Sequence, residues 1–311
     1  MKRILITGSN GLLGQKLVYR LKDRNDIQLI ATSKGDNRIA NKQGYIYQSL
    51  DITKKDEVEK VISYYLPDVI INTAAMTNVD ACESQQELCR KLNVDAVDYL
   101  LAAVKKEELK HSGYTCHFIH LSTDFIFDGA NGPYDENALP NPLSFYGQSK
   151  LDAEKLVVNS GVKYAIARTI IVYGIVDGMS RSNVVLWARE ALMKGQKINV
   201  VNDQFRTPTL AEDLADACIL IANKGVTGIY HISGKDYMSI LQLVERVADY
   251  FKLDKSLINP ISSASLNQPA KRPPVTGFKL DKAINDLGYN PHSFEEGLAI
   301  IEQQIKMVKA S

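Results

Sequence analysis

The chain has 311 residues, of which 45% are hydrophobic and 23% are charged, and its formal net charge at pH 7 is +1. This composition is that of a folded globular protein, long enough for one large domain or one and a half, and it excludes a disordered chain. The near-neutral charge, with lysines and arginines scattered along the chain, excludes a basic stripe for nucleic acid, and we expect no such partner.

No stretch of the chain has the pattern of a targeting or membrane segment. The N-terminal apolar run, Ile4-Leu5-Ile6, is too short for a signal peptide, and no later run approaches the roughly 18 residues of a spanning helix. We therefore expect a cytoplasmic protein without a membrane partner. The four cysteines lack metal-ligand or disulfide spacing, so we expect buried free thiols, no metal site, and structural roles for the five histidines.

The first motif is a glycine-rich turn near the N-terminus. The apolar run at residues 2–7 ends in glycines at positions 8, 11 and 14, and leucines then recur at helical spacing. This pattern predicts a strand, a tight turn and a helix whose unpaired N–H groups bind a diphosphate. We therefore predict a dinucleotide site that includes Gly8, Asn10, Gly11, Leu12 and Leu13, with a purely structural turn as the alternative.

The second predicted strand, residues 27–31, indicates which dinucleotide is bound. No acidic residue follows it to bind a ribose 2′-hydroxyl, whereas Ser33 and Lys34 do follow it, with Arg38 slightly beyond. A hydroxyl and cations suit a 2′-phosphate, so we predict NADP(H), with NAD as the alternative cofactor. The alternative for Lys34 and Arg38 is that they are solvated charges of a loop. Asp51, beside Ile52, is placed to meet the adenine edge or to cap the next helix.

Two further predicted strands end in residues that suit a binding crevice. The strand at residues 67–75 stops in Thr73, Ala74 and Ala75, whose small side chains let a ligand approach the backbone. The amphipathic helix that follows carries Asn93, which is either inward-facing or a neutral helix residue. After the strand at residues 115–121, the hydroxyl of Thr123 points into the crevice, unless this threonine only caps a loop.

Tyr146 and Lys150 stand four residues apart at the predicted start of a helix, which places the phenol and the ammonium group on one face. A free tyrosine, with a pKa of about 10, is a weak acid at neutral pH, but a neighbouring cation favours the phenolate and lowers that pKa. The pair therefore predicts a catalytic proton donor. The alternative is a helix surface that carries both residues without any catalytic role.

Strands alternate with helices regularly as far as about residue 172, which predicts an α/β fold with a doubly wound parallel (Rossmann) sheet. We assign residues 1–176 to a dinucleotide-binding domain and residues 177–311 mainly to a smaller, discontinuous substrate-binding lobe. The segment at about 208–232, with a capped helix from residue 209, is expected to return to the first domain. The proline-rich segment 256–278 is expected to be a surface loop.

These motifs together resemble the extended short-chain dehydrogenase/reductase family. The residues that carry the resemblance are Gly8-x-x-Gly11-x-x-Gly14, Asn72-Thr73-Ala74-Ala75, Asn93, Ser122-Thr123-Asp124 and Tyr146-Gly147-x-Ser149-Lys150. Within the family, Arg168-Thr169 and the stretch at residues 203–209 resemble the dTDP-4-dehydrorhamnose reductase group, and the resemblance covers nearly the whole chain. One departure is Ile171, where that group carries a tryptophan near the sugar.

The resemblance implies that NADPH reduces the C4 ketone of a nucleotide-linked deoxysugar, most directly dTDP-4-dehydrorhamnose to dTDP-rhamnose. Tyr146 would donate the proton, Lys150 would also hydrogen-bond the nicotinamide ribose, and Thr123 would orient the substrate oxygen. The resemblance also implies that Asp124 is a substrate-binding residue and that Arg206 and Arg272 bind the nucleotide diphosphate of the substrate. Either arginine has surface ion pairing as its alternative.

Two alternatives to this function stay open at the level of sequence. The first is a nucleotide-sugar epimerase or dehydratase of the same family, which would consume no net nicotinamide. The second is a non-catalytic regulatory subunit that binds NADP and controls a partner enzyme. A homodimer is also left open.

Overall fold

The structure is a computed structural model that describes residues 1–178 and 182–310. Its centre is a parallel sheet of seven strands in the order β11-β6-β5-β4-β1-β2-β3. The strands are β1 (Lys2–Thr7), β2 (Ile27–Ser33), β3 (Ile46–Ser49), β4 (Val69–Asn72), β5 (His117–Thr123), β6 (Tyr164–Thr169) and β11 (Gly228–His231). The predicted doubly wound α/β fold is confirmed.

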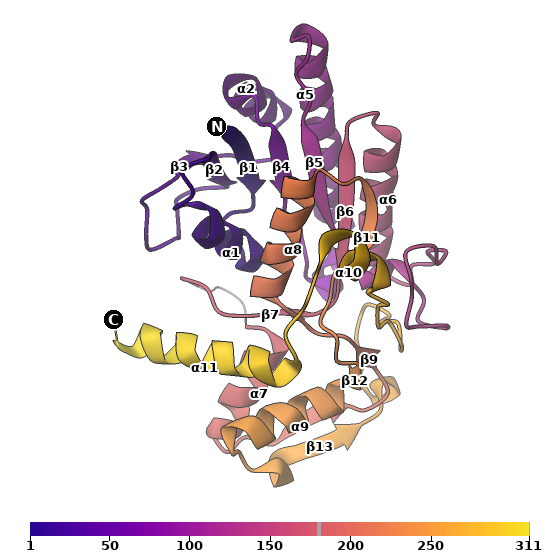
Figure 1. The fold of residues 1–311 in the computed structure, drawn as a ribbon. Helices are drawn as coiled ribbons and strands as arrows, with labels where there is room; N and C mark the ends of the chain where they lie inside the picture. The colour runs from indigo at the N-terminus through magenta and orange to yellow at the C-terminus, as the bar shows by residue number, and fades with distance from the viewer. Residues whose placement is uncertain (179–181, 311) are drawn as a thin grey trace.

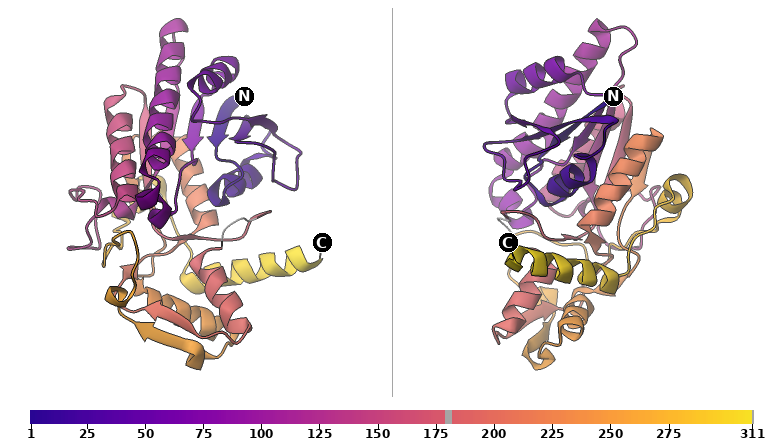
Figure 2. Two further views of the ribbon diagram at one scale, coloured as in Figure 1. Left: turned by 180° about the vertical axis from the view of Figure 1, so that it is seen from behind. Right: turned by 60° about the vertical axis from the view of Figure 1, so that its left-hand side comes forward.

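Helices cover both faces of this sheet (Figures 1 and 2). One face is covered by α1 (Leu12–Leu21), which packs on β1, and by α8 (Ala211–Lys224), which packs on β5 and β6. The other face is covered by α2 (Lys55–Tyr65), α5 (Ala96–Lys110) and α6 (Phe145–Asn159). Successive side chains of a strand point to opposite faces, so Ile4 and Ile6 join the first core and Leu5 joins the second. The strand order reverses between β1 and β4, and a crevice forms at such a switch point.

A smaller lobe lies below the carboxyl ends of the strands in Figure 1 and has its own apolar core. It contains α7 (Val184–Met193), β8 (Ile198–Val201), α9 (Ile240–Phe251) and α11 (Phe294–Ala310). The expectation that residues 256–278 form only loop is wrong in part. Ile258–Ile261 forms β13, which pairs in parallel with β8, because its backbone completes a two-stranded sheet at the edge of this lobe.

Short elements connect the two parts. The strand pairs are β7 (Val172–Tyr173) with β10 (Thr209–Leu210) and β9 (Phe205–Arg206) with β12 (Met238–Ser239). The remaining elements are α3 (Val79–Ser84), α4 (Gln86–Arg90), η1 (Lys91–Asp95), η2 (Asp124–Ile126), η3 (Lys255–Leu257), η4 (Ser263–Ser265) and α10 (Asp281–Leu287). In the described part of the chain, no helix combines the length and the apolar character needed to cross a bilayer.

Two local predictions need correction. The sixth strand ends at Thr169 and not at residue 172, because Ile171 takes a φ of 36°, in the left-handed region that β-branched residues avoid. The helix at residue 211 has Leu210 at its N-cap without a side-chain cap, so Thr209 does not cap it. Instead the Thr209 hydroxyl donates to the Ile170 carbonyl at 2.6 Å, which joins β10 to the end of β6.

Candidate active site

The glycine turn between β1 and α1 is built for close backbone approach. Gly8 has a φ of +69°, and a Cβ atom there would lie 2.9 Å from the backbone of Ala74. A Cβ atom on Gly14 would lie 2.3 Å from the Gly8 carbonyl oxygen. Gly11, at the N-cap of α1, supplies no side-chain cap, so the first N–H groups of this helix keep their capacity to bind an anion.

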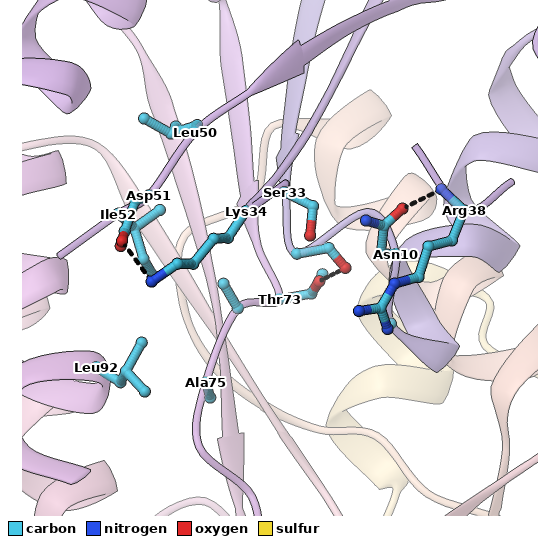
Figure 3. Close-up of a pocket in the computed structure, with 13 residues that line it drawn as sticks. Asn10, Ser33, Lys34, Arg38, Leu50, Asp51, Ile52, Thr73, Ala75 and Leu92 are labelled. Atoms are coloured by element: carbon cyan, nitrogen blue, oxygen red, sulfur yellow. Dashed lines mark hydrogen bonds and ion pairs between the residues drawn. The ribbon is translucent and has the colours of Figure 1, made fainter. Parts of the chain in front are cut away.

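A cavity of about 310 Å³ opens beside this turn at the switch point of the sheet (Figure 3). It is lined by residues at or after the carboxyl ends of β1, β2, β3 and β4, and by Leu92 from η1: Gly8, Asn10, Gly11, Ser33, Lys34, Arg38, Leu50, Asp51, Ile52, Thr73, Ala74, Ala75 and Leu92. The structure therefore brings together most of the residues that the sequence assigned to the cofactor. Leu50 and Leu92 are additional; their isolated apolar side chains carry no signal that separates them from core residues.

The polar end of the cavity is charged. The Lys34 ammonium lies 2.8 Å from the Asp51 carboxylate (Figure 3). The other carboxylate oxygen accepts hydrogen bonds from the backbone and the hydroxyl of Thr53. Partial burial opposes ionisation of Asp51, but the contacts with Lys34 and Thr53 outweigh it and lower its pKa to about 2. Asp51 therefore serves as a counterion at the cavity and does not occupy the N-cap of α2, which is Lys54.

On the opposite wall, Asn10 fixes the loop that follows β2. Its amide donates to the Asp36 carbonyl at 2.8 Å and accepts from the Arg38 backbone at 2.9 Å. Figure 3 shows the Arg38 side chain beside Asn10, on the side of the cavity away from Asp51. Two cations, Lys34 and Arg38, thus flank the hydroxyl of Ser33 at the end of β2.

Thr123, Tyr146 and Lys150 lie at the carboxyl edge of β5 and the start of α6. Their exposed fractions are 6%, 8% and 3%, respectively. Ser144 caps α6 by accepting from the Gly147 backbone, so the phenol and the ammonium group lie within the first two turns of a well-formed helix. The Thr123 hydroxyl donates to Asp124 at 3.1 Å and accepts from the Phe125 backbone at 3.2 Å.

The electrostatics of this group differ from the sequence prediction. Burial raises the pKa of Tyr146 above its ordinary value, and the contact with Thr123 opposes that shift only in part. Burial also lowers the pKa of Lys150 to about 8, against the attraction of Glu154. The expected lowering of the tyrosine pKa is therefore wrong, because removal of the phenol from water raises that pKa by more than the contact with Thr123 lowers it.

Asn93 lies in a single turn of π-helix, Lys91–Asp95, and is buried. Its amide oxygen accepts from the Met76 backbone at 2.7 Å, and its nitrogen donates to the Ser149 hydroxyl at 3.0 Å. It therefore fixes the loop after β4 against α6 and does not line the cavity, nor do Leu12 and Leu13. Such π-turns are frequently found at functional sites.

The three residues expected on the substrate side are engaged with protein partners. Asp124 is buried and accepts from the Thr276 hydroxyl at 2.5 Å. Arg206 is buried and donates to the carbonyl oxygens of Phe205, Pro273 and Pro274. Arg272 pairs with Asp80 at 2.7 Å, which is the surface ion pairing that the sequence left open. A substrate role for any of the three stays a prediction.

The chain has a glycine turn at the switch point of a parallel sheet, and Thr123, Tyr146 and Lys150 are buried at the end of β5 and the start of α6. These two features together define the class of Rossmann-fold reductases. Comparison with known proteins agrees. The profile of the RmlD substrate binding domain family matches residues 1–307, and the chain belongs to this family.

Three relatives illustrate the range of the family. The chain is 32% identical to dTDP-4-dehydrorhamnose reductase of Aggregatibacter actinomycetemcomitans, over 96% of this chain and 97% of that one. It is 31% identical to methionine adenosyltransferase 2 subunit beta of Xenopus laevis, over 90% and 82%. A solved structure of dTDP-4-dehydrorhamnose reductase from Bacillus anthracis in complex with NADP superposes with a TM-score of 0.82 at 27% identity, over 98% and 100%.

Proposed function

We propose that the protein uses NADPH to reduce the C4 ketone of a nucleotide-linked deoxysugar, most directly dTDP-4-dehydrorhamnose to dTDP-rhamnose. The observation that carries the proposal is the burial of Tyr146 and Lys150, one helical turn apart, beside Thr123. The reductase relative and the NADP-bound reductase structure support it.

The chain's own residues fit a dinucleotide. Side chains at Gly8 and Gly14 would collide with the backbone of Ala74 and of the turn, so the two glycines keep the turn tight beside α1. The uncapped start of that helix suits a diphosphate. Ser33, Lys34 and Arg38 at the polar end suit a 2′-phosphate, which favours NADP(H) over NAD. When bound, the nicotinamide supplies a hydride.

In this proposal Tyr146 gives its phenol proton to the carbonyl oxygen of the sugar, and Thr123 orients that oxygen. The raised pKa of Tyr146 keeps the phenol protonated before the reaction, so at neutral pH it carries the proton that it donates. Lys150, with a pKa of about 8, is mostly charged at neutral pH and stabilises the phenolate as it forms. The fixed orientation of these groups supplies much of the remaining acceleration.

The decisive experiment follows the absorbance of the reduced nicotinamide to measure NADPH oxidation by the purified protein with dTDP-4-dehydrorhamnose. Tyr146→Phe removes the proton donor, and we expect kcat to fall by about 100-fold or more. Tyr64→Phe, at a tyrosine that is 80% exposed, is the matched control and leaves kcat unchanged. No turnover with any 4-keto nucleotide sugar would contradict the proposal.

A second candidate is a regulatory subunit that binds NADP, since a relative of similar identity is named as a subunit of methionine adenosyltransferase. Tyr146→Phe also separates the two candidates. If that variant fully restores the phenotype of a strain that lacks the protein, the regulatory function is favoured. If it fails while it still binds NADPH, the catalytic function is favoured.

An epimerase or dehydratase is less well supported. Of the acidic residues near Thr123, the Asp124 carboxylate is held by both Thr123 and Thr276, so it is not free to act as an acid on a substrate. An enzyme of that kind would convert its sugar without net consumption of NADPH, which the same assay detects.

We also propose a cytoplasmic location and a division of the chain near residue 176. The thiols of Cys89, Cys116 and Cys218 are buried and form no disulfide, which suits a reducing compartment. Two apolar cores on the sheet and a third in the C-terminal lobe support the division.

Light scattering on the purified protein tests whether it forms a homodimer.

A further inference from the structure

His120, on β5, links the Lys150 ammonium group to the glycine-turn side of the sheet. Its ring is fully buried, and its Nε2 atom lies 3.4 Å from Lys150 Nζ. Its Nδ1 atom lies 3.1 Å from Asn72 Nδ2 on the neighbouring strand β4.

The chain of contacts continues across the sheet in one direction. The Ala74 N–H donates to Thr7 Oγ1 at 3.4 Å, and the Thr7 hydroxyl donates to Asn72 Oδ1 at 2.6 Å. The Asn72 amide nitrogen is then left to donate to His120 Nδ1. Thr7 and Asn72, the last residues of β1 and β4, stand in register with each other, and Asn72 stands in register with His120 in the middle of β5.

This direction determines the tautomer of His120. A neutral imidazole has one donor and one acceptor nitrogen. Burial and the Lys150 charge lower the pKa of His120 well below 6.5, so the ring is neutral. Because Nδ1 accepts from Asn72, Nε2 carries the hydrogen and points at Lys150 Nζ. A donor in that position matches the lone pair of an uncharged amine and opposes an ammonium group.

The other groups that face Lys150 do not supply an acceptor. Glu154, one turn further along α6, attracts the ammonium group, but its carboxylate is taken by Arg168 at 3.0 and 2.7 Å. The Cys89 thiol, from α4, contacts Ser149 and Asn93. Tyr146 lies one turn before Lys150 on the same helix.

We propose that His120 is a positioning residue whose Nε2–H faces Lys150 Nζ, disfavours the ammonium form and so lets Lys150 lose its charge at a lower pH. For the proposed reductase, this means that Lys150 loses its charge inside the pH range in which the enzyme works, and not only at much higher pH. The rate then falls on the alkaline side at a lower pH than it would without His120.

The first test does not depend on the proposed function. Nitrogen-15 spectra of cofactor-free, histidine-labelled protein report which ring nitrogen carries the hydrogen. We expect the Nε2–H tautomer for His120. His231 is an internal control for the opposite tautomer, because its Nδ1 faces the Tyr134 carbonyl and its Nε2 faces the Arg168 guanidinium. An Nδ1–H tautomer at His120 would overturn the inference even if the protein proves to have no reductase activity.

The second test is the pH profile of kcat and rests on the proposed reductase function. His120→Leu removes the donor, so we expect the alkaline limb to move up by about one pH unit. His120→Gln keeps one donor and one acceptor, and its limb stays where the wild type has it. His117→Leu, at a buried histidine on the opposite face of β5, controls for packing and leaves the limb in place. An equal loss of rate at every pH in His120→Leu means a purely structural role and overturns the inference.

Discussion

The carboxylate of Asp124 and the guanidinium group of Arg206 lie 3.6 Å apart, and each side chain is only 2% exposed. Asp124 directly follows β5, whereas Arg206 lies in β9, which pairs with β12 beside the C-terminal lobe. The Thr276 hydroxyl donates to the same carboxylate oxygen. Because Asp124 also accepts from Thr123, this buried pair connects the C-terminal lobe directly to the predicted catalytic threonine.

Removal of one partner should therefore destabilise the protein. Arg206→Met leaves the Asp124 charge buried without its cation, and we expect the free energy of unfolding to fall by about 3 kcal/mol. Urea denaturation measures this change. Arg272→Met, which breaks the more exposed pair with Asp80, is the matched control and should cost at most about 1 kcal/mol.

The same pair of variants tests the substrate role that the sequence assigned to both arginines. If Arg206→Met keeps full stability but raises the KM for the sugar nucleotide, Arg206 is a substrate ligand, and the buried ion pair with Asp124 is not its main function. A loss of stability without a change in KM supports the structural role.

Gly14 should be intolerant of any side chain. A Cβ atom there would lie 2.3 Å from the Gly8 carbonyl oxygen and 2.6 Å from Ser9 Cα, and neither backbone atom can move without opening the turn. We expect Gly14→Ala to destabilise the protein by about 2 kcal/mol, as overpacking in a rigid site does. Thermal unfolding measures the change.

Gly11→Ala is the control for that prediction. Its Cβ atom would meet a single neighbour, the Gly8 carbonyl oxygen at 3.2 Å, and its φ of −81° suits any residue. We expect a much smaller loss of stability. Equal losses in the two variants would mean that close packing of α1 on the turn is not what requires Gly14.

The sequence predicts the features that depend on local pattern. Apolar strands, glycine spacing and small residues at strand ends were enough to predict the parallel sheet and most of the cavity, because each feature lies within a few residues of its cause. Ser33, Lys34 and Asp51 line the cavity for that reason.

Features that depend on distant partners could not be predicted in this way. Arg206 is buried because its acceptors are the carbonyl oxygens of Pro273 and Pro274, far along the chain. His120 had no sequence signal, since its role arises from the register of β4 and β5. The pKa of Tyr146 depends on burial, which the spacing of Tyr146 and Lys150 does not report.

Lys34 should set the cofactor preference. Its side chain is 80% exposed at the cavity, although its ammonium group contacts Asp51, so it can turn towards a phosphate. We expect Lys34→Ala to weaken NADPH binding by about tenfold, because one exposed charge–phosphate contact is worth about 1.4 kcal/mol at most, and to leave NADH binding unchanged. Fluorescence titration of both cofactors measures the ratio. Equal weakening of the two would contradict a contact with the 2′-phosphate.

Buried histidines should make the protein sensitive to mild acid. Burial, with a further contribution from the Arg168 charge, lowers the pKa of His231 to about 3, and burial lowers that of His117 to about 4. In the unfolded chain a histidine has a pKa of about 6.5. Below that pH the histidine binds a proton in the unfolded state but stays unprotonated in the folded state. Each histidine therefore contributes stability that is fully present above pH about 6.5 and is lost as the pH falls towards the folded value, at up to about 1.4 kcal/mol per pH unit.

His231→Gln removes this titration but keeps a donor for the Tyr134 carbonyl and an acceptor for Arg168. We expect its unfolding free energy, measured in urea between neutral pH and about pH 4, to fall less steeply than that of the wild type. His117→Gln should flatten the curve by a similar amount, and the double variant by nearly the sum, because the two rings have no partner in common. Parallel curves for the wild type and His231→Gln would mean that carboxylates alone cause the acid sensitivity.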